Sequence, residues 1–257
     1  MTLVAAEFVP SIRSICQTEK APILQSFLFW QNVLAVPAGV FAKSVRVIVT
    51  GRRNTGNFKD RRLHYQFIEN LTNLYTDAIV CNAAEVAHDA HARERFLTGK
   101  LEVIGNGVDV EHFGKARPMN LRKVYPALVD AEYIVGTVGN MKRQKRHDIF
   151  LRTIHKLREV QPNLKGIIVG RDLGEEKSLR ALREELDLEE AVIFAGGVTD
   201  PAPYVRAFDA FLLTSDFEGM PNAILEAMAA HCPVVTTASG GTEEVVEHCR
   251  TGFLTYT

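Results

Sequence analysis

One stretch of the chain decides the fold and points to a site: Ser215-Asp216-Phe217-Glu218-Gly219-Met220-Pro221-Asn222-Ala223-Ile224-Leu225-Glu226. The apolar run before it, from Phe208 to Leu213, is typical of a buried strand. Proline in the first turn of a helix wastes no backbone amide, so we expect a helix that begins at Pro221. Glu218 then lies in the loop before this helix, and Glu226 lies more than one turn inside it.

The backbone of this loop is suited to an anionic ligand. Gly219 has no side chain, so a ligand can approach the main chain closely. Amides at the start of a helix have no acceptor within it and can hold an anion. An acidic loop residue, a glycine backbone and a helix N-terminus together predict a binding site for a phosphorylated sugar.

The stretch resembles the retaining glycosyltransferases of family 4, which have the GT-B fold of two facing Rossmann-like domains. The family motif is S-x-x-E-G-x-P-x-x-x-x-E, and every fixed position is present here. The likeness continues through Ala227-Met228-Ala229-Ala230, Pro233-Val234-Val235 and Gly240-Gly241-Thr242-Glu243-Glu244. The resemblance implies an α/β fold with parallel sheets in two Rossmann-like domains.

The resemblance gives the two carboxylates different roles. It implies that Glu226 accepts hydrogen bonds from the ribose hydroxyls of a nucleotide-sugar donor, and that Glu218 contacts the hydroxyls of the donor sugar. Two carboxylates at one sugar would indicate hydrolysis by double displacement. Because only one is expected there, the resemblance implies front-side transfer, in which the leaving phosphate acts as the base.

The same resemblance implies that backbone amides approach the sugar and phosphate. Gly219 and Met220 belong to this set. Pro221 has no amide, so Asn222 and Ala223 are the expected donors at the helix start.

A departing nucleoside diphosphate needs its charge neutralised, either by a metal or by fixed cations and helix dipoles. The segment Thr137-Val138-Gly139-Asn140-Met141-Lys142-Arg143-Gln144-Lys145 is similar to the family segment V-G-R-x-x-x-x-K, whose arginine and lysine grip the diphosphate. Lys145 matches the lysine, whereas the uncharged Asn140 stands at the arginine position. Lys142 or Arg143 are the candidates to compensate. We therefore expect no metal and no cofactor, the nucleotide-sugar being a co-substrate.

Two glycine turns complete the predicted donor site. Gly170-Arg171-Asp172 resembles the family turn V-G-x-G, with its second glycine replaced. Phe194-Ala195-Gly196-Gly197-Val198 resembles the segment whose backbone reads the nucleotide base, which makes Gly196 a candidate contact. Glycine is also common in plain turns after strands, so that interpretation stays open.

Apolar runs alternate with amphipathic stretches along the whole chain, which predicts parallel sheets with helical crossovers. The expected strands are Ile23–Phe29, Val45–Val49, Ala78–Cys81, Leu101–Ile104, Tyr133–Val138, Gly166–Val169, Ala191–Phe194, Ala210–Leu213 and Pro233–Thr236. We place a domain boundary between residues 118 and 119. The resemblance implies that 1–118 is an incomplete acceptor-side domain and 119–257 a donor domain without its last helices, so that the chain is truncated at both ends.

Charge is uneven although the net charge of the 257 residues is −1. Residues 1–118 carry 14 basic and 11 acidic side chains, or +3, and residues 119–257 carry 16 and 20, or −4. This balance does not suggest a nucleic-acid partner. Much of the basic excess falls in one segment, namely Arg52, Arg53, Lys59, Arg61 and Arg62. It indicates either a solvated face or a surface for an anionic acceptor or phospholipid headgroups.

The segment Ala21–Ala42 carries no charge and is long enough to span a bilayer. Interruptions by Gln, Asn, Pro and Gly favour a strand, Ile23–Phe29, followed by a helix, Asn32–Ala42. The four cysteines show no metal-type spacing, and Cys81 and Cys232 lie in or beside apolar runs, which fits a reducing compartment. No signal peptide is visible, so we expect a cytoplasmic protein.

The resemblance implies a retaining, metal-independent glycosyltransferase that uses a UDP- or GDP-sugar. Its expected acceptor is a glycan, a lipid or a small molecule, as in the synthesis of cell-envelope polysaccharide, with peripheral contact at the inner membrane surface. The alternative is a catalytically inactive nucleotide-binding or scaffold protein derived from such an enzyme. A nucleotide-sugar epimerase is disfavoured by the complete two-glutamate motif.

Overall fold

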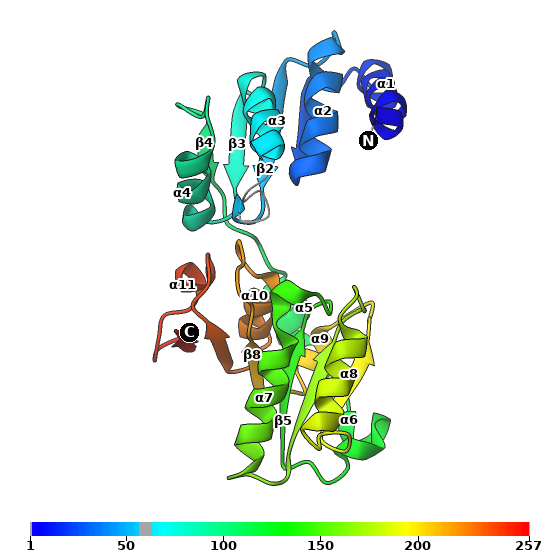
Figure 1. The fold of residues 1–257 in the computed structure, drawn as a ribbon, viewed down its shortest axis with the longest axis vertical. Coiled ribbons are helices and arrows are strands. Elements are labelled where there is room, and N and C mark those ends of the chain that lie inside the picture. Colours follow the sequence, from blue (N-terminus) through cyan, green and yellow to red (C-terminus); the bar gives the residue numbers. More distant parts are fainter. Residues whose placement is uncertain (1, 57–62, 257) are drawn as a thin grey trace. The chain divides into compact units, whose positions relative to one another are not determined.

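The computed structural model describes residues 2–56 and 63–256. Its contacts divide the chain into two units, Met1–Asn106 and Gly107–Thr257. Each unit holds one parallel sheet with helices packed against it (Figure 1), which confirms the predicted α/β class. The predicted boundary lay later in the chain, and helix α5 (Val110–Lys115) accounts for the difference because it packs on α10 (Asn222–Ala229).

The first unit is built on a sheet in the order β1-β2-β3-β4. Its strands are β1 (Ile23–Phe27), β2 (Val47–Arg52), β3 (Ala78–Cys81) and β4 (Leu101–Val103). Its helices are α1 (Thr2–Thr18), α2 (Phe29–Phe41), α3 (Leu63–Leu74) and α4 (Ala84–Arg93). The uncharged segment 21–42 folds as a strand followed by a helix, as the sequence predicted. Within the described ranges, no helix is both long and apolar enough to cross a membrane.

The second unit is built on a sheet in the order β10-β9-β8-β5-β6-β7, with every pair parallel. Its strands are β5 (Tyr133–Val138), β6 (Leu164–Val169), β7 (Val192–Gly196), β8 (Ala210–Leu213), β9 (Val234–Thr237) and β10 (Phe253–Thr255). Its helices, with α5 and α10, are α6 (Leu121–Val124), η2 (Pro126–Leu128), η3 (Arg143–Lys145), α7 (His147–Arg158), α8 (Glu176–Glu185), α9 (Ala202–Val205) and α11 (Thr242–Val245). The sequence analysis did not predict β10.

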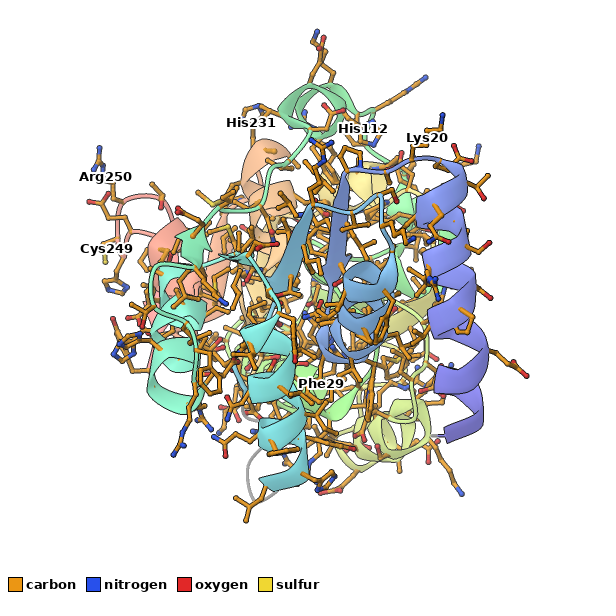
Figure 2. The ribbon with its side chains drawn as sticks, turned by 90° about the horizontal axis from the view of Figure 1, so that it is seen from above. Lys20, Phe29, His112, His231, Cys249 and Arg250 are labelled. Carbon is orange, nitrogen blue, oxygen red and sulfur yellow. The ribbon has the colours of Figure 1, made fainter. Side chains whose placement is uncertain are left out.

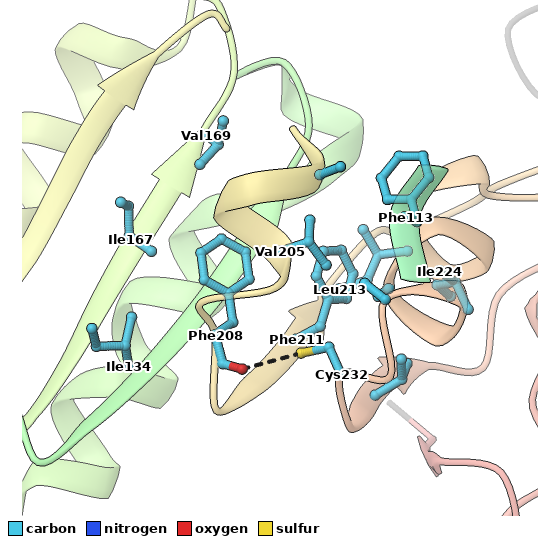
Figure 3. Packing of buried hydrophobic residues seen from close by; sticks show 14 of the residues in the cluster. Phe113, Ile134, Ile167, Val169, Val205, Phe208, Phe211, Leu213, Ile224 and Cys232 are labelled. Atoms are coloured by element: carbon cyan, nitrogen blue, oxygen red, sulfur yellow. Dashed lines mark hydrogen bonds between the residues drawn. The ribbon is translucent and has the colours of Figure 1, made fainter. Parts of the chain in front are cut away.

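Both faces of this second sheet are buried. Because successive side chains of a strand point to opposite sides, neighbouring residues belong to two different core clusters. Ile134 and Ile167 join one core cluster, which Figure 3 shows with Phe208 and Phe211. Their chain neighbours, such as Ile168, join a second cluster beneath α7 and α8. The apolar runs read as strands in the sequence are therefore the central layer of a three-layer unit.

Three of the four cysteines are buried in this fold. Cys81 and Cys232 are core residues, as predicted, and Cys232 Sγ lies 3.7 Å from the carbonyl oxygen of Phe208 (Figure 3). Cys16 is also buried. Cys249, labelled in Figure 2 beside Arg250, is exposed on the turn before β10.

Arg52 departs from both interpretations of the basic segment, since only 6% of it is exposed. Its guanidinium lies 3.1 Å from Glu69 Oε1 and 3.0 Å from Glu94 Oε2. Burial alone would lower the pKa of Arg52, but the two carboxylates outweigh it and raise the pKa. Arg52 is therefore an internal cation of the first unit, and it is neither a solvated nor a ligand-binding surface residue. Lys59, Arg61 and Arg62 lie outside the described residues.

Candidate donor site

The order of strands in the second unit marks where a ligand should bind. The chain runs from β5 to β6 and β7 on one side, and continues from β8 on the other side of β5. Ligands of open α/β sheets bind beyond the carboxyl ends of the strands at such a switch point. The loop after β5 carries Lys145, and the loop after β8 carries Glu218.

These two predicted residues meet. Lys145 Nζ donates to Glu218 Oε1 at 2.6 Å, and the two side chains are only 14% and 10% exposed. The side chain of Lys145 passes along Gly139, where a Cβ would lie 3.5 Å from its Cδ. The structure thus places an ammonium and a carboxylate, distant in sequence, at one partly buried point at the end of β5.

Hydrogen bonds from side chains and from the backbone hold the loop after β5 against the loop after β8. Thr214 Oγ1 donates to the carbonyl oxygens of Lys145 and Arg146, at 3.1 and 2.8 Å. The amide of Asp216 donates to the carbonyl of Gln144 at 3.0 Å, and the Gln144 side chain donates to the carbonyl of Phe217. These bonds fix the backbone of both loops and so place Lys145 against Glu218.

Arg146 also connects the two loops, and it does so from an unusual backbone conformation. Its φ of 48° and ψ of 47° lie in the left-handed region, which a non-glycine residue adopts at a cost. Its guanidinium bonds Asp216 at 2.7 Å and Asp148 at 3.0 Å, and these partners raise the pKa of Arg146. The ion pairs hold the chain in the turn that leads from Lys145 into α7.

The loop of Glu218 also rests on the turn after β9. The amide of Gly241 donates to the carbonyl of Gly219 at 2.7 Å. Gly240 has a φ of +56°, and a Cβ on it would lie 1.9 Å from the carbonyl oxygen of Glu218. Glycine is needed at position 240 for both reasons. The double glycine noted in the sequence is thus part of the support for Glu218.

Helix α10 begins at Asn222, one residue later than predicted, with Pro221 as its N-cap. Asn222 and Ala223 are in its first turn, where amides precede the helix's own hydrogen bonding. Glu226 lies one turn further along. Burial raises the pKa of Glu226, and the nearby Lys145 opposes that shift. Lys145 therefore interacts electrostatically with Glu226 while it is paired with Glu218.

A cavity of about 290 Å³ opens over the ends of β5, β6 and β7. It is lined by Val138, Gly139, Asn140, Val169, Gly170, Arg171, Gly197, Val198, Pro201 and Glu226. Two predicted contacts, Asn140 and Glu226, are among them. Gly196 has a φ of +74° and shapes the turn, whereas its neighbours Gly197 and Val198 form the wall.

Lys142 and Arg143, the residues predicted to replace the missing arginine charge, do not line this cavity. Lys142 and Arg143 line a second cavity, of about 780 Å³, with His147 and residues of α8. Burial, and then the neighbouring Lys145, lower the pKa of Lys142. Arg171 lines the first cavity instead, and the sequence analysis gave it no role. The sequence could have indicated a role for Arg171, because this residue follows a strand of the same parallel sheet and therefore lies at the same edge as Lys145 and Glu218.

Residues 132–257 match the family described as Glycosyl transferases group 1. The chain is 26% identical over 217 residues to an N-acetylgalactosaminyltransferase of Campylobacter jejuni that acts on a diphospho-undecaprenol-linked sugar, covering 82% of this chain and 56% of that protein. It is 27% identical over 229 residues to the lipopolysaccharide core biosynthesis mannosyltransferase LpsB of Rhizobium meliloti, covering 84% and 60%. The chain thus spans little more than half the length of these relatives.

Solved structures have closely similar folds. Anabaena Alr3699/HepE in complex with UDP-glucose superimposes with a TM-score of 0.82 at 26% identity, covering 96% of this chain and 68% of that one. Sucrose-phosphate synthase from Thermosynechococcus elongatus gives a TM-score of 0.80 at 19% identity, covering 96% and 63%, and supports the fold alone. These neighbours are GT-B glycosyltransferases, which confirms the predicted fold. Sequence and structure therefore agree on a GT-B architecture that carries, over residues 132–257, a match to glycosyl transferases group 1.

Proposed function

We propose that this protein is a retaining, metal-independent glycosyltransferase that moves a sugar from a UDP- or GDP-sugar to a glycan, lipid or small-molecule acceptor. The observation that carries the proposal is the pair Lys145–Glu218 at the switch point of the sheet, beside the cavity that Glu226 lines. The UDP-glucose bound to the structural neighbour from Anabaena supports a nucleotide-sugar donor.

In this mechanism, Lys145 stabilises the departing diphosphate. The charge that develops on the leaving group is greatest in the transition state, so a fixed ammonium in a partly buried site lowers the barrier more than it tightens ground-state binding. The N-terminus of α10 adds a partial positive charge at its first turn. Together these groups supply the positive charge that a divalent ion supplies in other transferases.

The two glutamates divide the donor between them. Glu226 accepts hydrogen bonds from the ribose hydroxyls, as a carboxylate with lone pairs on both oxygens can. Glu218 accepts from hydroxyls of the sugar and keeps Lys145 oriented. Because one carboxylate serves the sugar, the acceptor attacks from the face that the phosphate leaves, and a phosphate oxygen takes its proton. The anomeric configuration is then retained.

The test is turnover of labelled donors by the full chain. With UDP-glucose, UDP-N-acetylglucosamine, UDP-galactose and GDP-mannose offered in turn, we expect slow release of nucleoside diphosphate from at least one donor, unchanged by EDTA. The Glu218→Gln variant should lose this release by about 100-fold or more, as for other groups that act in the transition state.

Three results would contradict this proposal. Binding without any hydrolysis or transfer would indicate the nucleotide-binding scaffold instead. A product with an isomerised sugar still joined to its nucleotide would indicate an epimerase. Release that EDTA abolishes would contradict the metal-independent mechanism.

We also propose that the acceptor is lipid-linked or part of a larger glycan, and that α3 contacts a phospholipid surface. The two relatives named above act, by their names, in undecaprenol-linked and lipopolysaccharide-core synthesis. Along α3, the apolar side chains Leu63, Phe67, Leu71 and Leu74 are 80%, 69%, 49% and 49% exposed. Their spacing puts them on one helical face.

Vesicle sedimentation tests the membrane contact. We expect the wild-type protein to pellet with vesicles that contain anionic phospholipid, and Phe67→Glu to lose most of that binding because it puts a charge in the apolar face. Val160→Glu is the matched control, because Val160 is 80% exposed in the second unit. Equal loss in both variants, or a wild-type protein that stays in the supernatant, would overturn the idea.

A further inference from the structure

Two cationic side chains lie at the cavity that Glu226 lines: Arg171 is part of its wall, and Lys145 packs against the wall residue Gly139. At the β5 end, Lys145 runs along Gly139. At the β7 end, Arg171 runs over Gly197, where a Cβ would lie only 2.3 Å from Arg171 Cγ and 3.0 Å from its Nε. β5, β6 and β7 are consecutive in the sheet, so the two ends are separated by two strand spacings, about 10 Å.

Hydrogen bonds fix the backbone of Arg171, and its exposed side chain keeps its charge available to a ligand. Its amide donates to Asn140 Oδ1 at 3.0 Å, and its carbonyl accepts from the amide of Met141 at 2.8 Å. The absence of a side chain at Gly197 provides the space for its aliphatic stem. No residue in the described part of the chain forms a hydrogen bond or ion pair with the Arg171 guanidinium. Arg146, by contrast, has both Asp148 and Asp216.

The two ends suit different parts of a nucleoside diphosphate. In the proposed function, on which this inference rests, the diphosphate binds at Lys145 and the start of α10. The base then reaches the β7 end and Arg171. A guanidinium has five hydrogen-bond donors and no acceptor, so it can bond a carbonyl oxygen of a base but cannot accept from an amino group.

We propose that Arg171 determines base specificity, by donating a hydrogen bond to a carbonyl oxygen on the edge of the base. It would favour uracil over cytosine, which carries an amino group in place of one uracil carbonyl. It would favour guanine over adenine for the same reason, since guanine presents an oxygen where adenine presents an amino group. The uncharged Asn140 then serves to hold the backbone of Arg171, while Arg171 reads the base.

Calorimetric titration of the full chain with two matched pairs, UDP with CDP and GDP with ADP, tests this role. The wild-type protein should bind the member that has a carbonyl oxygen where the other has an amino group, UDP over CDP or GDP over ADP, about tenfold more tightly, as a hydrogen bond to a charged group allows. Arg171→Met keeps the stem and removes the donors, so it should lose about tenfold in affinity for that member and little for the other. Arg171→Lys should keep part of the preference.

The control is Arg152→Met, because Arg152 is an exposed arginine of α7 away from the cavity. It should leave all four affinities unchanged. Equal losses for both members of a pair in Arg171→Met would mean that Arg171 contacts ribose or phosphate, and would overturn base reading. An unchanged preference would overturn it as well. Failure of the wild-type protein to bind any of the four nucleotides would refute the proposed function itself, and is thus distinguishable from failure of the Arg171 role.

Discussion

Replacing Lys145 by methionine is expected to lower the affinity for UDP by about 100-fold and donor turnover by at least as much. A charge-assisted hydrogen bond to phosphate is worth about 1.5–3 kcal/mol. The substitution also leaves Glu218, 8% exposed, without its ammonium partner and close to an incoming diphosphate. The lost attraction of Lys145 and the remaining repulsion from Glu218 both lower the affinity for the diphosphate. Calorimetry with UDP and release of UDP from a labelled donor measure the two effects.

A double variant separates these contributions. Lys145→Met with Glu218→Gln removes the repelling carboxylate along with the ammonium, so it should bind UDP more tightly than Lys145→Met alone. Turnover should not recover, because the transition state still lacks its cation. Lys156→Met is the control, since the Lys156 side chain is 75% exposed on α7. Wild-type affinity in Lys145→Met would contradict the assignment of Lys145 to the diphosphate.

Acidification is expected to destabilise the second unit through His147. This side chain is 3% exposed, and no described residue bonds either ring nitrogen. Burial, and then the neighbouring Lys145, lower the pKa of His147 to about 4, from 6.5. The unfolded chain therefore binds more protons between these two values. The contribution of the neutral His147 ring to the free energy of unfolding is present in full above pH 6.5 and is lost as the pH falls towards 4. The loss is about 3 kcal/mol at 1.36 kcal/mol per pKa unit.

Urea unfolding between pH 4 and pH 7 measures this loss. Pulse hydrogen exchange of peptides from β5 and β6 reports on the second unit alone. His147→Leu removes the titrating ring and should flatten the pH dependence by about 3 kcal/mol. His88→Gln changes an exposed histidine of the first unit and should leave these peptides unaffected. The same acid sensitivity in His147→Leu as in the wild-type protein would assign the effect to other groups.

The sheet of the second unit could be predicted because its central strands are buried on both faces. Such strands have uninterrupted apolar sequences, and the bounds of β5 and β8 match those runs without change. In the first unit, the bounds of β3 also match the predicted run, although its side chains alternate between buried and partly exposed. The meeting of Lys145 with Glu218 could be anticipated for a related reason, since each follows a strand of one parallel sheet. The short edge strand β10 was missed because it has little apolar length to mark it.

The side chains around the site were harder to predict, because their directions depend on turns that carry no sequence period. The left-handed residue Arg146 and the turn η3 send Lys142 and Arg143 towards α8, while Lys145 faces Glu218. Spacing alone did not distinguish these three cations.

The internal role of Arg52 was hidden for a similar reason. Its carboxylate partners lie 17 and 42 residues further along the chain, at Glu69 and Glu94. Only the packing of the first unit brings the three charges together, and a basic cluster read from the sequence cannot reveal it.

Hydrogen–deuterium exchange of the full chain with and without UDP tests the central claim most directly. We predict that UDP slows exchange in three loops beyond the carboxyl ends of β5, β6 and β7 and at the start of α10, in peptides that cover 138–146, 169–173, 196–201 and 217–226. Residues 175–182, at the second cavity, should exchange as before. Protection confined to that second cavity or to the first unit, or no protection at saturating UDP, would contradict the account.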